Sequence, residues 1–207
     1  MRALPDSFLI LSVAVTLVSV AFHEFAHGYA AYLQGDLTAK YEGRLTVNPL
    51  KHLDMVGSII VPALLLASGS PAFGWAKPVP YNPYNLRNRR WGAVAVAAAG
   101  PLSNLALALV FSLVFRSLQP GSPYAEFSLL VVWVNAALFL FNLMPVPPFD
   151  GAKILGGFLG RHGRWLIEAP LSTALALALV AAFFIWPIIS PLVGILVLLL
   201  TGGGFGA

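Results

Sequence analysis

The sequence contains no cysteine, and charged residues make up only 10% of its 207 positions. The absence of cysteine excludes disulfide bonds and metal sites built from thiolates. Soluble domains usually contain about 25% charged residues, which they need to cover their surface. Because the sequence is also 58% hydrophobic, the shortage of charge argues against a soluble protein and indicates one that is embedded in a lipid bilayer.

The chain also lacks a long polar stretch, a linker and an internal repeat, so we expect residues 1–207 to form a single membrane domain. The net charge of +4 does not indicate a nucleic-acid partner here. The basic residues lie in short loops between apolar runs, where such residues set the orientation of a membrane protein.

Four apolar runs are long enough for helices that cross a bilayer, which takes about 20 residues. They cover residues 8–34, 91–118, 126–144 and 170–201. Pro187 and Pro191 interrupt the last run, so it forms either one kinked helix or two short ones. The sequence therefore predicts an all-α polytopic membrane protein with about 4–6 transmembrane helices.

The region between the first two spans is mixed. Residues 38–47 have the weak pattern of a strand or β-hairpin, and residues 73–88 that of an ordered interfacial loop. The apolar run 55–67 is too short to cross the bilayer as a straight helix. We therefore expect a small β-hairpin and a re-entrant segment after the first helix.

The first span contains the sequence His23-Glu24-Phe25-Ala26-His27. On an α-helix, residues four apart differ by about 40° around the axis, so both imidazoles can reach one metal ion. Glu24 lies about 100° from His23, where its carboxylate can approach a water on that metal. This arrangement is typical of zinc-dependent hydrolases. A polar cluster that only braces helices is disfavoured, because unpaired ionisable groups in a membrane cost several kcal/mol.

A catalytic zinc usually takes three protein ligands, so a third must come from elsewhere. Asp150 is the best candidate, since it follows prolines that break the third span where a cavity is needed to satisfy the backbone. It could also cap the next helix, and the two roles are compatible. We expect His52 and His162 to be solvated loop residues. The remaining aspartates lie at the ends of apolar runs: Asp6, Asp36 and Asp54.

Two motifs together resemble the site-2 protease family of intramembrane zinc metalloproteases, especially its short members without a PDZ or CBS domain. They are H-E-x-x-H at residues 23–27 and N-x-x-P-x-P-x-x-D-G at residues 142–151. Segments 48–49, 74–80 and 100–104 also resemble this family. The resemblance covers roughly residues 15–160. Phe149 departs from the leucine that is common there, and some relatives have a helix before the H-E-x-x-H helix.

The resemblance implies that His23, His27 and Asp150 bind one Zn²⁺ ion. It also implies that Glu24 is the general base, which deprotonates the attacking water and then protonates the leaving amine.

Two asparagines have less certain roles. By the resemblance, Asn142 would bind the scissile peptide or the developing oxyanion, although it could instead satisfy the broken backbone after it. Asn104 could orient Asp150 or a histidine, or it could hold two helices together.

The expected function is hydrolysis of a peptide bond in a transmembrane segment of another protein, with the lipid bilayer as the second partner. Residues 38–47 and 74–88 could hold the substrate as an extended strand. Basic residues near the site predict that it faces the cytoplasm of a multi-pass protein in the plasma membrane. Two alternatives remain, a catalytically silent zinc-binding protein and, less favoured, a transporter. The oligomeric state stays open.

Overall fold

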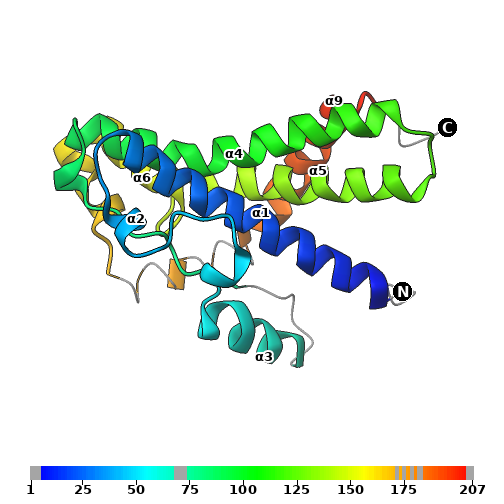
Figure 1. Ribbon diagram of the computed structural model, residues 1–207, viewed down its shortest axis with the longest axis horizontal. Coiled ribbons are helices and arrows are strands. Elements are labelled where there is room, and N and C mark those ends of the chain that lie inside the picture. The colour runs from blue at the N-terminus through cyan, green and yellow to red at the C-terminus, as the bar shows by residue number, and fades with distance from the viewer. Residues whose placement is uncertain are drawn as a thin grey trace.

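Three long apolar helices form the body of the protein (Figure 1). The computed structural model describes residues 6–67, 74–170 and 184–203, together with residues 173, 176, 177 and 180. The long helices are α1 (Asp6–Leu33), α4 (Arg89–Ser117) and α5 (Pro123–Asn142). Each is long and apolar enough to cross a membrane, and they lie close to the predicted spans 8–34, 91–118 and 126–144.

Side-chain hydrogen bonds cap the N-termini of two of these helices. The carboxamide oxygen of Asn88 accepts hydrogen bonds from the backbone N–H groups of Arg90 and Trp91 at the start of α4. The hydroxyl of Ser122 accepts one from Ala125 at the start of α5. Both are N-caps, which satisfy donors that the first helical turn leaves without partners.

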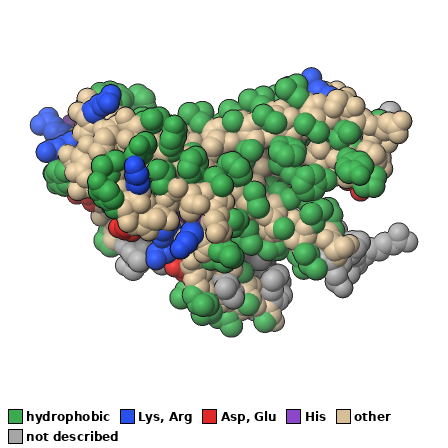
Figure 2. All heavy atoms as spheres, viewed as in Figure 1, with side chains coloured by type: hydrophobic (Ala, Val, Ile, Leu, Met, Phe, Trp, Pro, Cys, Tyr) green, Lys and Arg blue, Asp and Glu red, His purple; other side chains and the backbone are tan. Residues whose placement is uncertain are grey.

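Helix α4 packs against both α1 and α5. The short helix α6 (Asp150–Leu159) packs against α4, and α9 (Trp186–Thr201) packs against α5. A buried apolar cluster joins α5, the turn after it and α9; its members are Val132, Ala136, Met144, Phe149, Ile189, Val193 and Val197. Many apolar side chains are exposed on the outside of the bundle, among them Ile10, Leu113 and Leu199, and Figure 2 shows such side chains spread over the face in view. Such a surface suits contact with lipid.

The C-terminal end of α1, the N-terminal end of α4 and helix α6 lie at the same end of the bundle. Arg87 N donates to Gln34 O over 3.2 Å, and Arg90 Nε donates to Gly157 O over 2.7 Å. All lysines and arginines except Arg2 and Arg116 belong to residues 40–90 and 153–164. Most of the blue side chains in Figure 2 accordingly gather at this end.

Residues 38–47 do not form the expected strand or hairpin. They begin with the short helix α2 (Thr38–Tyr41), and no residue that the structure describes is in a β-strand. The Asp36 carboxylate accepts hydrogen bonds from Thr38 N and Thr38 Oγ1, which starts the helical turn. Gly43 ends it with φ of 64°, a conformation that glycine adopts without strain. β-Propensity without a partner strand was insufficient here.

The segment 55–67 forms a π-helix, η2 (Met55–Ile60), followed by α3 (Val61–Ala67). The Asp54 side chain caps it by accepting from Gly57 N over 2.7 Å. Its re-entrant placement in a bilayer stays a prediction. Whether residues 170–201 form one helix or two depends on positions outside the described residues, because the described helix α9 begins only at Trp186.

Residues 74–82, which we name the strap, contain no helix or strand and run beside α1. Segments 36–57 hold the strap by hydrogen bonds. These are Trp75 N to Gly57 O (3.1 Å), Lys77 N to His52 O (2.9 Å), Arg44 Nη2 to Lys77 O (2.8 Å) and Asn82 N to Asp36 Oδ2 (2.7 Å).

The expectation of solvated loop histidines is correct for His162, which is exposed, but wrong for His52. His52 is only 2% exposed, and its Nε2 donates to Thr46 O over 2.8 Å. It is buried because its loop packs beneath the strap, a contact that its basic neighbours in the sequence do not reveal.

Asp36 should be essential for holding the strap. Its carboxylate is 1% exposed and accepts hydrogen bonds from Thr38, Asn82 and Asn85. Burial alone would raise the pKa of Asp36, but these hydrogen bonds together hold it below its usual value. We expect Asp36→Asn to lower the free energy of unfolding by about 2–3 kcal/mol at pH 7. Thermal unfolding in detergent micelles measures this.

The pH dependence provides a check. Since the pKa of Asp36 is lower in the folded state, its contribution is present above the unfolded value of about 3.9 and is lost as the pH falls through the folded value. The difference between wild type and Asp36→Asn should therefore shrink only in acid. The exposed Glu42 provides the control, because Glu42→Gln should leave the melting temperature unchanged. Equal melting temperatures for all three proteins at pH 7 would contradict the assignment.

Candidate metal centre

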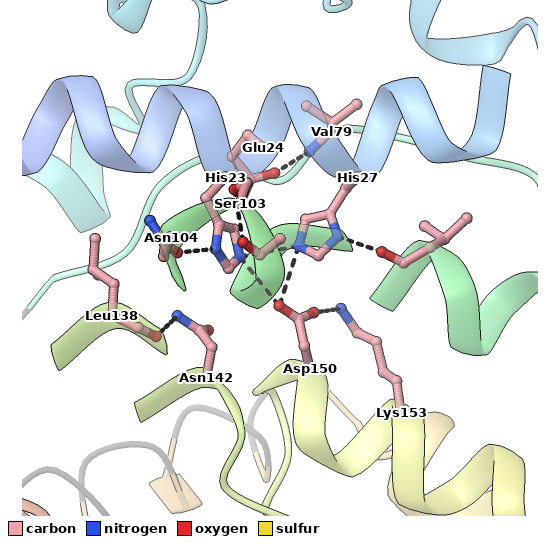
Figure 3. A network of polar contacts seen from close by, with 12 residues as sticks. His23, Glu24, His27, Val79, Ser103, Asn104, Leu138, Asn142, Asp150 and Lys153 are labelled. Carbon is pink, nitrogen blue, oxygen red and sulfur yellow. Dashed lines mark hydrogen bonds and ion pairs between the residues drawn. The ribbon is translucent and has the colours of Figure 1, made fainter. Parts of the chain in front are cut away.

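Two histidines and an aspartate converge inside the bundle (Figure 3). His23 and His27 lie one turn apart on α1, and their Nε2 atoms are 3.0 Å from each other. Each Nε2 is also 3.1 Å from Oδ2 of Asp150. All three residues are buried. Within the part of the chain that the structure describes, this is the one group of histidine and acidic side chains that could hold a metal ion.

Hydrogen bonds to the outer ring nitrogens determine where each histidine carries its proton. Nδ1 of His27 lies 2.7 Å from Val96 O, and a carbonyl can only accept, so this Nδ1 carries the hydrogen. Nδ1 of His23 lies 2.6 Å from Oδ1 of Asn104, which is likewise an acceptor. In the neutral form of each histidine, Nε2 therefore turns a lone pair toward Asp150. Three acceptors in contact require a cation, and this donor set suits zinc.

Two glycines allow the backbone to approach this centre. A Cβ atom at Gly100 of α4 would lie 2.6 Å from His23 Nε2 and closer still to His27 Nε2. A Cβ atom at Gly151 would lie 2.5 Å from Met144 O, so α6 can begin directly against the turn after α5 only with glycine there. The backbone of α4 thus forms one wall of the centre.

Asp150 is the first residue of α6, and the N-cap position belongs to Phe149. Asp150 therefore does not cap α6, which was the alternative role that the sequence left open for it. At the N-terminus of a helix the partial positive charge of the backbone N–H groups favours a carboxylate. The other oxygen of Asp150, Oδ1, accepts a hydrogen bond from Lys153 Nζ over 3.1 Å.

Glu24 lies beside the histidines on α1 and faces the strap (Figure 3). Its Oε2 accepts a hydrogen bond from Val79 N over 2.8 Å. Together with the three converging residues it lines a cavity of about 660 Å³, which is large enough for a segment of peptide. Asp54, Asn142 and Lys153 also line this cavity.

Asn104 takes part in both roles that the sequence left open. Its Oδ1 accepts from His23, and its Nδ2 donates to Asn135 Oδ1 on α5 over 2.9 Å. Asn135 in turn donates to Ser19 Oγ over 2.9 Å. Sequence reasoning missed Asn135, although a lone amide in an apolar span was the available signal. It also missed the backbone groups of Val96 and Val79, which leave no mark in a sequence.

Asn142 reaches the cavity from the last turn of α5. Its Nδ2 donates to Leu138 O over 2.9 Å, a carbonyl of the preceding turn of α5 and not of the broken backbone after Asn142, so this bond differs from the structural role that the sequence allowed. The amide has a second N–H, so the role in binding substrate stays a prediction.

The close approach of Gly100 provides a test of the metal centre. We expect Gly100→Ala to reduce metal binding strongly, because the added methyl group would occupy the space next to both Nε2 atoms. Metal content after purification and the affinity measured against a chelator would show it.

Gly194 of α9 supplies the control, since a Cβ atom there meets nothing within 4 Å. Gly194→Ala should keep full metal content and, as alanine favours helix, should unfold at the same or a slightly higher temperature. Unchanged metal affinity in Gly100→Ala would show that the ion is bound elsewhere.

Comparison with known proteins agrees with this geometry. Residues 117–186 match the family described as Peptidase family M50, a stretch that contains Asn142 and Asp150. The protein named "Putative zinc metalloprotease YwhC" from Bacillus subtilis is 44% identical over 160 residues, which cover 73% of this chain and 70% of that protein.

Two further relatives carry similar names. "Putative zinc metalloprotease MJ0611" from Methanocaldococcus jannaschii is 31% identical over 156 residues, covering 72% of this chain and 73% of the relative. "Putative zinc metalloprotease Rip2" from Mycolicibacterium smegmatis is 30% identical over 144 residues, covering 69% of this chain and 54% of that protein. No solved structure matches. The chain belongs to peptidase family M50, the site-2 protease family, and is a membrane protein that hydrolyses peptide bonds with zinc.

Proposed function

We propose that this protein cleaves other membrane proteins at a peptide bond in or near a transmembrane segment. The observation that supports this most is the position of the converging ligands. His23 and His27 lie within a helix long and apolar enough to cross a membrane, and the cavity beside them is lined by residues of all three such helices. A site at this depth suits a substrate that itself lies in the bilayer.

The contacts support distinct roles for the three converging residues and for Glu24. Zinc held by His23, His27 and Asp150 would polarise the scissile carbonyl and lower the pKa of the attacking water. The Glu24 carboxylate takes a proton from that water and passes it to the nitrogen of the leaving amine. The bond from Val79 N to its Oε2 holds the carboxylate in the cavity and leaves Oε1 for the proton.

The substrate would bind along the strap. A peptide bond inside a helix is shielded from attack, so the substrate segment must be extended near the site. The strap contains no helix, and it lines the cavity with Trp75, Ala76 and Val79. Residues 38–47, the other candidate for this role, form α2 and a turn instead. The second N–H of Asn142 would donate to the substrate carbonyl as negative charge develops on its oxygen.

The end of the bundle next to the site would face the cytoplasm. This end contains the loops with most of the lysines and arginines, and short cytoplasmic loops carry an excess of such residues. The loop between α4 and α5 would then lie on the opposite side of the membrane. Water would then reach the cavity from the cytoplasmic side.

The role of Glu24 can be tested by Glu24→Gln. The glutamine keeps an oxygen that can accept from Val79 N, so the fold and the zinc content should be unchanged. Loss of the general base should reduce the rate of cleavage by about 10²–10⁴-fold. Both are measured on the purified protein in liposomes that contain a model transmembrane substrate.

Glu42→Gln, a change of an exposed acid outside the site, is the matched control and should cleave at the wild-type rate. Full activity of Glu24→Gln would rule out Glu24 as the base. A wild-type protein that binds zinc but leaves every membrane substrate intact would favour the catalytically silent alternative.

The orientation can be tested with single cysteines, because the chain has none of its own. His162 and Gln119 are both exposed and lie at opposite ends of the bundle. A membrane-impermeant maleimide should label Gln119→Cys in intact cells but should label His162→Cys only after lysis. The reverse pattern would place the site on the outer side.

A further inference from the structure

The two carboxylate oxygens of Asp150 have different partners (Figure 3). Oδ2 lies 3.1 Å from Nε2 of both His23 and His27. Oδ1 accepts a hydrogen bond from Lys153 Nζ, also at 3.1 Å. One oxygen thus faces the metal position, and the other is held by an ammonium group.

Lys153 is placed for this contact by the helix itself. It lies three residues after Asp150 on α6, and residues three apart are neighbours on one face of a helix. Its side chain is 40% exposed, whereas that of Asp150 is 5% exposed. Of the described residues that line the cavity, Lys153 is the one lysine or arginine, and the acids Glu24 and Asp54 line it as well.

We propose that Lys153 is a positioning residue that keeps Asp150 a one-oxygen ligand of zinc. A carboxylate that is free to turn can offer both oxygens to a metal ion. The second oxygen would then occupy the coordination position that a catalytic zinc must keep open for water. A charge-assisted hydrogen bond from Lys153 to Oδ1 opposes that rotation. The contact also offsets the negative charge that Asp150 and Glu24 bring to the cavity.

The competing interpretation is an ordinary ion pair between neighbours on a helix, which contributes little because water screens it. The two interpretations differ in what they predict for the metal. A screened surface pair can be removed without any effect on zinc affinity or coordination. A residue that orients a ligand changes both, and loss of such contacts typically weakens metal binding about 10–100-fold.

The experiment compares the wild type, Lys153→Met and Lys153→Arg, each as the full-length zinc protein in detergent. Lys153→Met removes the charge with little change in volume, and we expect its zinc affinity, measured by competition with a chelator, to fall about 10-fold or more. Lys153→Arg keeps a positively charged side chain, so its zinc affinity should be closer to that of the wild type. After exchange of zinc for cobalt, Lys153→Met should absorb visible light more weakly, because a two-oxygen Asp150 raises the coordination number.

Lys51→Met is the matched control, since Lys51 is exposed and does not line the cavity; it should match the wild type in both measurements. Wild-type affinity and spectrum in Lys153→Met would overturn the proposal, and so would equal losses in Lys153→Met and Lys153→Arg. Should Lys153→Met fail to fold, Lys153→Gln replaces it. Zinc affinity should then be highest in the wild type, lower in Lys153→Arg and lowest in Lys153→Gln. Equal affinities would overturn the proposal.

This inference deepens the proposed function, but its two metal measurements do not require a membrane substrate. Cleavage adds a third readout on the same proteins, in which Lys153→Met should lower kcat more than it changes KM. If the wild type cleaves no membrane substrate while the metal measurements behave as expected, intramembrane cleavage fails and the role of Lys153 stands.

Discussion

The structure depends on the contact of three hydrogen-bond acceptors that repel one another without a cation. Two imidazole lone pairs and one carboxylate oxygen lie within 3.0–3.1 Å of each other, and all are buried where water cannot screen them. Such a cluster is unfavourable in an empty protein and becomes favourable only with a positive ion between the ligands. Metal binding and the packing of α1, α4 and α6 are therefore coupled.

The polar contacts around the centre make this arrangement the stable one. Val96 O and Asn104 Oδ1 each accept a hydrogen bond from an outer ring nitrogen, so each neutral histidine presents an Nε2 lone pair, and not an N–H, to Asp150. Asn104 is held in turn by Asn135, which binds Ser19. In an apolar bundle each of these polar side chains would be costly without a hydrogen-bond partner. The series of hydrogen bonds from Ser19 through Asn135 and Asn104 to His23 gives each of them a partner. The two asparagine side chains hold the imidazole of His23 in one orientation and join α1, α4 and α5.

Much of this centre could be predicted from the sequence, because the rules involved are local. Helical spacing places His23 and His27 on one face, and the prolines before Asp150 mark a broken helix. Asn104 could also be named as a side chain that orients a histidine. The groups at Val96 and Val79 could not be found in this way, since they are backbone atoms that every residue has. The burial of His52 and the helical turn at Thr38 follow from contacts with the strap and from Asp36, which depend on the folded chain.

Most lysines and arginines, the break between α5 and α6 and the strap all lie at the same end of the molecule. This arrangement answers two opposing requirements. Hydrolysis needs water and ionisable groups, whereas helices that cross a membrane are stable there only when their outer faces carry few such groups. The histidines lie within a long apolar helix, yet Asp150 reaches them from a short helix at the basic end of the bundle. Polar groups can thus be satisfied from one side while the outer faces of the long helices stay apolar.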